Sequence, residues 1–191
     1  MDLSRNSLIR MWWLASRFWQ WPVARGLLLV STRTRLDGFD VYDASIDGTE
    51  APLGRISEAL ELIRARAPRR SERLRRDVRR IVVIAAGGPE YWPEADAIVV
   101  TRRTLDQSRE EVALVIVHEA THARLWAMGI PYIHALRGRI EHTCVRAEVA
   151  FAQTLPDAEG WTERLQRKLE TPWWTDDALR ARRAAAWREL R

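Results

Sequence analysis

The sequence lacks several features that would place it in a common protein class. Cys144 is the single cysteine among 191 residues, which excludes an intramolecular disulfide and a cysteine-rich zinc module and favours a cytoplasmic protein. No unit recurs along the chain, so repeat architectures are excluded. The pair Gly87-Gly88 is not followed by the Gly-Lys-Ser/Thr ending of a phosphate-binding loop. The composition, 47% hydrophobic and 30% charged, is that of a globular domain.

An uninterrupted hydrophobic run is also absent from the amino-terminal part of the chain. Arg17, Gln20, Pro22 and Arg25 interrupt its apolar residues, which excludes a clean transmembrane helix or signal peptide. The same stretch holds four of the ten tryptophans, and tryptophan mixed with arginine is typical of membrane interfaces. For residues 1–36 three interpretations stay open: a helix packed on the core, a peripheral membrane contact and an uncleaved targeting signal.

Lysine is almost missing from this basic chain. Lys168 is the only lysine among 31 basic residues, and the net charge is only +5. A charge excess this small does not indicate a nucleic-acid partner. The arginine cluster from Arg64 to Arg80 contains no interleaved aromatic residues and matches no nucleic-acid-binding motif. We therefore expect a solvated helix face there, and a phosphate-contacting patch is the less favoured alternative.

The chain is predicted to fold as a few strands followed by helices, an α+β domain. A hairpin is expected around Asp37-Gly38, a favoured turn pair. Ser108 and Glu111 form a capping box at the start of a long helix. The expected elements are strands at 27–36, 39–43, 81–86 and 97–101, and helices at 55–67, 108–128 and 134–154, with two amphipathic helices in the tail. We predict three segments: the amino-terminal segment 1–36, a catalytic domain 37–156 and a helical tail 157–191.

The chemically informative motif is His118-Glu119-Ala120-Thr121-His122 in the long helix. Histidines at i and i+4 lie on one face of a helix about one turn apart, so both rings can reach a single metal ion. A glutamate directly after the first histidine lies beside such an ion and can accept a proton from its bound water. The motif therefore predicts one Zn²⁺ ion held by His118 and His122, with Glu119 as the catalytic base.

The stretch from Val115 to Ala123 resembles the active-site helix of zincin metallopeptidases. The resemblance implies a small zincin-like domain, a few-stranded sheet followed by the helix of this motif and a second helix that carries a further ligand. It implies a peptide or protein as substrate and hydrolysis of a peptide or amide bond. In zincins an edge strand above the metal holds the extended substrate, and Ala97 to Thr101 is expected to be that strand.

A third zinc ligand is needed, because catalytic zinc has three protein ligands and one open position. The residues after His122 do not supply the third histidine of metzincins, so a glutamate from the next helix is expected, as in gluzincins. Glu141 is the predicted ligand and Glu148 is the alternative; His134, Glu141 and Glu148 would form one polar stripe. Residues seven apart lie roughly 10 Å apart along a helix, so only one glutamate can bind the ion directly. The other would orient a histidine or pair with an arginine.

The expected mechanism uses zinc to acidify a bound water and Glu119 to move its proton to the leaving amine. Tyr132, His134 and His142 are candidates for stabilising the oxyanion or supporting the ligands. Two alternatives remain: hydrolysis of an amide other than a peptide bond, and a non-catalytic binding or regulatory protein stabilised by the metal. Cys144 is expected to be a small buried hydrophobe, and a zinc-thiolate role is its less favoured alternative.

Overall fold

The structure is a computed structural model that describes residues 31–44, 53–85 and 87–171, together with 26, 28, 29 and 174. The tryptophan-rich residues before 26 and the second helix expected in the tail lie outside the described residues. Within them the fold is α+β, as predicted, with a five-stranded mixed sheet and six α-helices.

The sheet is built from five short strands in the spatial order β1-β2-β3-β5-β4. Strands β2, β3 and β5 run parallel to one another, whereas β1 and β4 are antiparallel to their neighbours. The predicted hairpin joins β1 to β2, and positive φ angles of 50° at Asp37 and 89° at Gly38 suit its tight turn. The strands are β1 (Thr32–Leu36), β2 (Phe39–Asp43), β3 (Arg80–Ile84), β4 (Glu90–Trp92) and β5 (Ala97–Thr101).

The prediction that Ala97 to Thr101 forms an edge strand was wrong. These residues form β5, which lies between β3 and β4, and all five of them are buried. The edge strand on this side of the sheet is instead β4, a three-residue strand that pairs antiparallel with β5. The physical reason is that β5 is apolar at four of its five positions, as expected for a strand covered on both faces.

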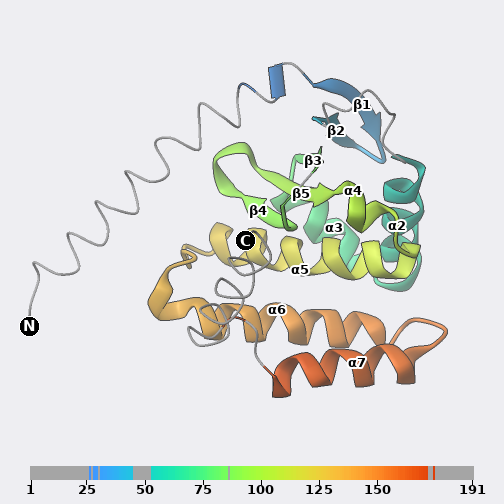
Figure 1. The fold of residues 1–191 in the computed structure, drawn as a ribbon, viewed down its shortest axis with the longest axis vertical. Helices are drawn as coiled ribbons and strands as arrows, with labels where there is room; N and C mark the ends of the chain where they lie inside the picture. Colours follow the sequence, from blue (N-terminus) through green and yellow to red (C-terminus); the bar gives the residue numbers. More distant parts are fainter. Residues whose placement is uncertain are drawn as a thin grey trace, which may run out of the picture.

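Helices pack in successive layers beneath the sheet (Figure 1). Helix α5 lies next to the sheet, α6 lies under α5, and α7 lies under α6, whereas α2 and α3 flank α5. The helices are α2 (Leu53–Arg66), α3 (Pro68–Asp77), α4 (Arg102–Leu105), α5 (Arg109–Ala127), α6 (Arg137–Ala152) and α7 (Ala158–Glu170), with 3₁₀ turns η1 (Pro93–Ala95) and η2 (His134–Leu136).

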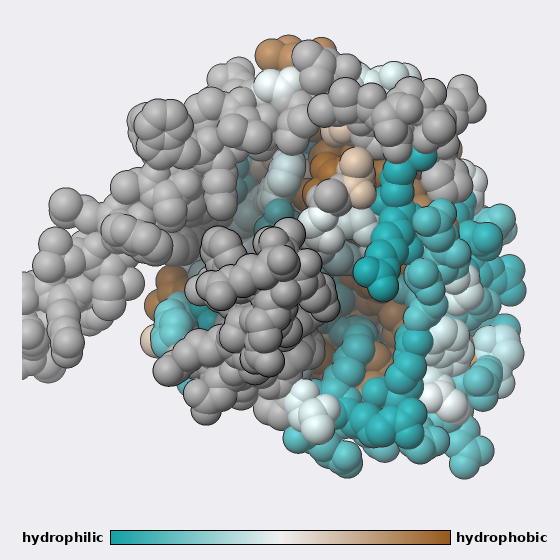
Figure 2. All heavy atoms as spheres, viewed as in Figure 1, coloured by the Kyte–Doolittle hydropathy of each residue, from teal (hydrophilic) through white to brown (hydrophobic). Residues whose placement is uncertain are grey.

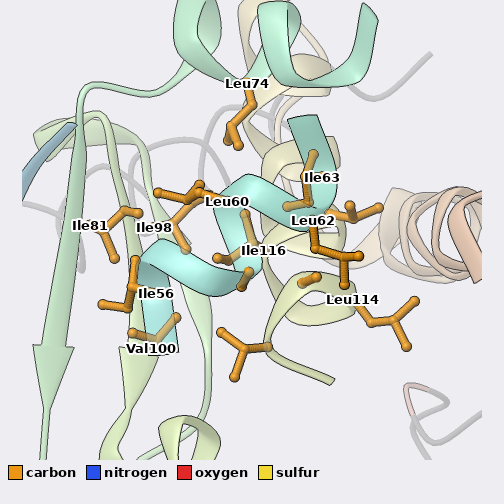
Figure 3. Close-up of a cluster of buried hydrophobic side chains, with 14 of the residues drawn as sticks. Ile56, Leu60, Leu62, Ile63, Leu74, Ile81, Ile98, Val100, Leu114 and Ile116 are labelled. Carbon is orange, nitrogen blue, oxygen red and sulfur yellow. The ribbon is translucent and has the colours of Figure 1, made fainter. Parts of the chain in front are cut away.

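The main hydrophobic core lies between the sheet and helices α2 and α5, and it continues into α6 and α7 through Phe151, Ala152 and Leu165. Ile81 of β3 and its neighbour Ile98 of β5 point toward this core, where they meet Ile56 and Ile116 (Figure 3). Successive side chains of a strand point to opposite faces of the sheet, so Val82, the residue after Ile81, belongs to a smaller cluster on the other face. One face of α5 is therefore fixed to the sheet, and its opposite face is left for α6.

The described surface in the view of Figure 2 is mainly hydrophilic, with apolar residues seen chiefly in recesses between polar ones. Among the described residues no helix combines the length and apolar character needed to cross a membrane.

Candidate metal centre

Helix α5 places the paired histidines where two helices meet. The hydroxyl of Ser108 caps its first turn by accepting the backbone N–H of Glu111 at 3.2 Å, as the capping-box pattern predicts. Burial of Val112, Ile116 and other apolar residues then fixes the rotation of the helix on the sheet and α2. With that rotation set, His118 and His122 lie on the side of α5 that meets α6.

The turn after α5 brings the chain back over the histidines. Gly129 adopts φ 77°, a left-handed conformation that favours glycine, and its N–H bonds the carbonyl of Trp126 at 2.8 Å. The ring of Tyr132, three residues later, lies edge-on to the His122 ring with 5.2 Å between the centroids. Helix α6 then presents Glu141, whose side chain is 3% exposed, to the same point.

The side chains of His118, His122 and Glu141 converge on one small volume. The two Nε2 atoms are 3.2 Å apart. The carboxylate of Glu141 reaches both rings, at 3.3 Å from Nε2 of His118 and 3.7 Å from Nε2 of His122. Nitrogen and oxygen ligands about 2.0–2.1 Å from a tetrahedral zinc ion lie roughly 3.3 Å from one another. The spacing of these three groups therefore fits the ligand set of such an ion.

The two oxygens of the Glu141 carboxylate have different surroundings, and Oε2 is the one left to bind a metal ion. Its Oε1 accepts a hydrogen bond from the Tyr132 hydroxyl at 2.6 Å. Its Oε2 is buried and accepts no hydrogen bond within the described part of the chain, and Nε2 of His118 lies 3.3 Å from it. A buried carboxylate oxygen is costly unless a cation, here a protonated His118 or a metal ion, satisfies it. The donor types and this oxygen both fit a bound zinc ion.

Glu148 engages the other side of the His118 ring. Its Oε1 lies 2.5 Å from Nδ1 of His118, while the Nε2 of that ring faces His122 and Glu141. The second oxygen of Glu148 accepts a hydrogen bond from Nζ of Lys168, on α7, at 3.1 Å. The two glutamates therefore make different contacts. Glu141 lies near Nε2 of both histidines, whereas Glu148 contacts the opposite nitrogen, Nδ1, of His118.

The surroundings shift the pKa values of the two histidines in opposite directions. Burial lowers the pKa of His118, but its contacts with the carboxylates of Glu141 and Glu148 outweigh burial and raise the pKa to about 10. Burial and the neighbouring charge of His118 lower the pKa of His122 to about 4. The two carboxylates therefore favour positive charge on the His118 ring, which keeps its proton when no other cation is present.

The pKa values of the buried carboxyls of Glu119 and Glu141 are shifted in opposite directions. Glu119 is 5% exposed, and burial raises its pKa to about 8, with Glu141 and Glu90 of β4 adding to the rise. Burial also raises the pKa of Glu141, but His118 and Tyr132 more than compensate, so that this pKa is lowered. Glu141 is thus suited to remain an anionic ligand, while Glu119 is suited to exchange a proton near neutral pH.

Cys144 lies in the same cluster, one helical turn after Glu141. Ligand atoms of His118, His122 and Cys144 all lie within 4.8 Å of one another. The thiol is fully buried, and burial together with the nearby carboxylates raises its pKa. Because the thiolate is the form that binds metals, these surroundings oppose ligation by Cys144. Cys144 is buried, as the sequence suggested, and its position beside the histidines is a structural finding.

The other predicted site residues, Tyr132, His134 and His142, are all exposed, and among them Tyr132 has contacts with the buried cluster. His134 lies in η2 and His142 in α6. Tyr132 contacts the cluster directly through Glu141 and His122. The sequence analysis missed Lys168 as part of this network. Its only distinguishing signal was that it is the single lysine of the chain.

Comparison of the chain with protein-family models, with curated proteins and with solved structures gave no match.

Proposed function

We propose that the protein is a zinc-dependent hydrolase that cleaves a peptide or another amide bond with a metal-activated water molecule. The observation that carries the proposal is the convergence of His118, His122 and Glu141, with the buried Glu119 directly after His118 in the chain. Three protein ligands leave one position of a tetrahedral ion open, which is the composition of catalytic zinc sites. The resemblance of the α5 motif to that of zincin peptidases supports the same reaction.

Each residue has a distinct part in the proposed reaction. Zinc held by His118, His122 and Glu141 would supply a polarised water molecule and an electrophile for the substrate carbonyl. Glu119 would accept the proton of the attacking water and return it to the leaving amine, a part open to a buried carboxyl that directly follows a ligand histidine. Tyr132, whose hydroxyl already lies at Glu141 Oε1, is the best placed of the three oxyanion candidates.

The proposed substrate site uses β4 in place of β5. β4 ends the described sheet, and α5 packs against it. An extended peptide can add to such an edge through backbone hydrogen bonds. The influence of Glu90 on Glu119 indicates that this strand lies close to the proposed catalytic base.

Elemental analysis and peptide hydrolysis test this proposal together. We expect about one zinc ion per wild-type chain and little in His118→Ala, since catalytic sites require three protein ligands. Glu119→Gln should keep the zinc but lose about 100-fold or more of the hydrolysis of a peptide library, since it removes the general base. Equally low zinc in wild type and His118→Ala would contradict the metal centre, and undiminished hydrolysis by Glu119→Gln would contradict the assigned base.

A second candidate is a non-catalytic protein stabilised by the metal. It is favoured by one observation, the position of Cys144 within reach of both histidines. Four protein ligands would close the ion to water, as in structural zinc sites. The raised pKa of Cys144 and the presence of Glu119 favour the catalytic candidate.

A further inference from the structure

We infer that Lys168 is a positioning residue for the proposed metal centre, acting through Glu148 on the orientation of His118. The inference deepens the proposed function and rests on it. It assigns a role at the site to α7 (Ala158–Glu170), a helix that carries none of the proposed ligands.

The contacts form a continuous chain from α7 to the metal-facing nitrogen. Lys168 Nζ lies 3.1 Å from Glu148 Oε2, and Glu148 Oε1 lies 2.5 Å from His118 Nδ1. The Glu148 side chain is 4% exposed, so solvent does little to fix its orientation. With one oxygen on the lysine and the other on the ring, rotation of the carboxylate is blocked at both ends. The tautomer and direction of the His118 ring follow, because Nδ1 must donate to Glu148 for Nε2 to face the ion.

Lys168 also supplies a cation to Glu148. Its Nζ lies 3.1 Å from Oε2 of this buried carboxylate, and a buried carboxylate is stable only when it stays paired.

The choice of lysine over arginine is unusual in this chain. Lys168 is the single lysine, and all the remaining basic residues among the 31 are arginines. An ammonium group is a compact charge that can meet a single carboxylate oxygen, whereas a planar guanidinium favours two-oxygen contacts. Glu148 can offer only Oε2, since Oε1 is taken by His118. A single-point donor therefore suits the geometry at this position.

The body of α7 is fixed independently of Lys168. Leu165 is fully buried, and Nη1 of Arg164 lies 2.5 Å from Oε1 of Glu111 in the first turn of α5. The guanidinium of Arg164 also stacks 4.3 Å from the centroid of the Trp161 ring. Because these contacts dock the helix one turn earlier, removal of the lysine charge should leave α7 in place.

Zinc affinity of the full chain, measured by competition with a chelating dye, tests the inference. We expect Lys168→Met to bind zinc about tenfold more weakly than wild type, at the low end of the effect of residues that orient metal ligands. Lys168→Arg should recover part of the loss. Arg167→Met is the matched control, because Arg167 is the adjacent residue and pairs with Glu163 at the surface, away from Glu148. It should bind zinc like wild type.

A spectroscopic measurement separates positioning from a general effect on stability. The His118 Nδ1–H proton, observed by NMR in the metal-free chain, should be shifted strongly downfield by its short bond to Glu148. Lys168→Met should move this resonance and Arg167→Met should not. If wild type binds zinc, and Lys168→Met matches Arg167→Met in affinity and in this resonance, the role of Lys168 is overturned alone. A wild-type chain that binds no zinc overturns the proposed function and with it the inference.

Discussion

At the scale of single residues, the His118 ring is the centre of the site because both of its nitrogens are engaged. Nε2 faces His122 and Glu141, and Nδ1 faces Glu148. An imidazole can thus span the two turns of α6 that separate the glutamates. In this arrangement Glu141 can bind a metal ion while Glu148 holds the His118 ring, and neither side chain has to move.

Replacement of Cys144 by serine should leave zinc binding and hydrolysis close to those of wild type. The reason is that the buried thiol, with its raised pKa, stays protonated, and the protonated form is a poor ligand. The measurement is the absorption spectrum of the Co²⁺-substituted protein, together with zinc affinity. We expect no sulfur-to-cobalt charge-transfer band in wild type. A band that disappears in Cys144→Ser would instead support the closed, non-catalytic site.

The sequence alone predicted part of this residue-scale arrangement. The spacing of His118 and His122 requires only a helix, so their common face could be foreseen. The sequence predicted Glu141 as the third ligand but kept Glu148 as the alternative, because both lie on nearly the same face of α6. The choice between them depends on how α5 crosses α6, which is set by packing between segments distant in the chain. The lysine that meets Glu148 depends in turn on the packing of α7.

At the scale of elements, local signals determined which predictions held. Helix α5 has a cap, an apolar face and a glycine stop within its own sequence, and it was foreseen almost to its ends. Strand β4 was missed, since three residues between Pro89 and Pro93 carry no periodic pattern. It exists because β5 offers it an antiparallel partner.

Loss of the α5 cap should destabilise the fold without disturbing the site. Ser108→Ala removes the acceptor for the N–H of Glu111 and should cost about 1 kcal/mol of unfolding free energy. For a domain of this size, that corresponds to a fall of about 3 °C in Tm. Thermal unfolding measures the loss, and Ser108→Asp, which keeps a capping acceptor, should recover most of it. Zinc affinity should stay unchanged, because the cap lies nearly three turns from His118. A Tm unaltered in Ser108→Ala would show that the cap contributes nothing.

At the scale of the whole molecule, the site lies at the junction of two layers. Helix α5 is fixed to the sheet by the main core, whereas α6 joins it through a face that includes the buried charges of Glu141 and Glu148. An interface that buries acids is stable only when cations balance them. A metal at this point would therefore bind the helical layer α6–α7 to the sheet layer as well as serve the reaction.

Removal of zinc should accordingly lower the stability of the molecule, and unevenly. A ligand that binds only the folded state stabilises it by about 4 kcal/mol at a thousandfold excess over its Kd, so a chelator should lower Tm by on the order of 10 °C. Calorimetry with and without chelator measures this loss. The Tm of His118→Ala should be the same in both conditions. Amide exchange should rise more in α6 and α7 than in β3 and β5, because the two strands stay paired with each other and packed with buried residues of α2 when the junction loosens. Equal exchange changes in both layers would mean that the ion stabilises the fold as a whole and does not join two separable layers.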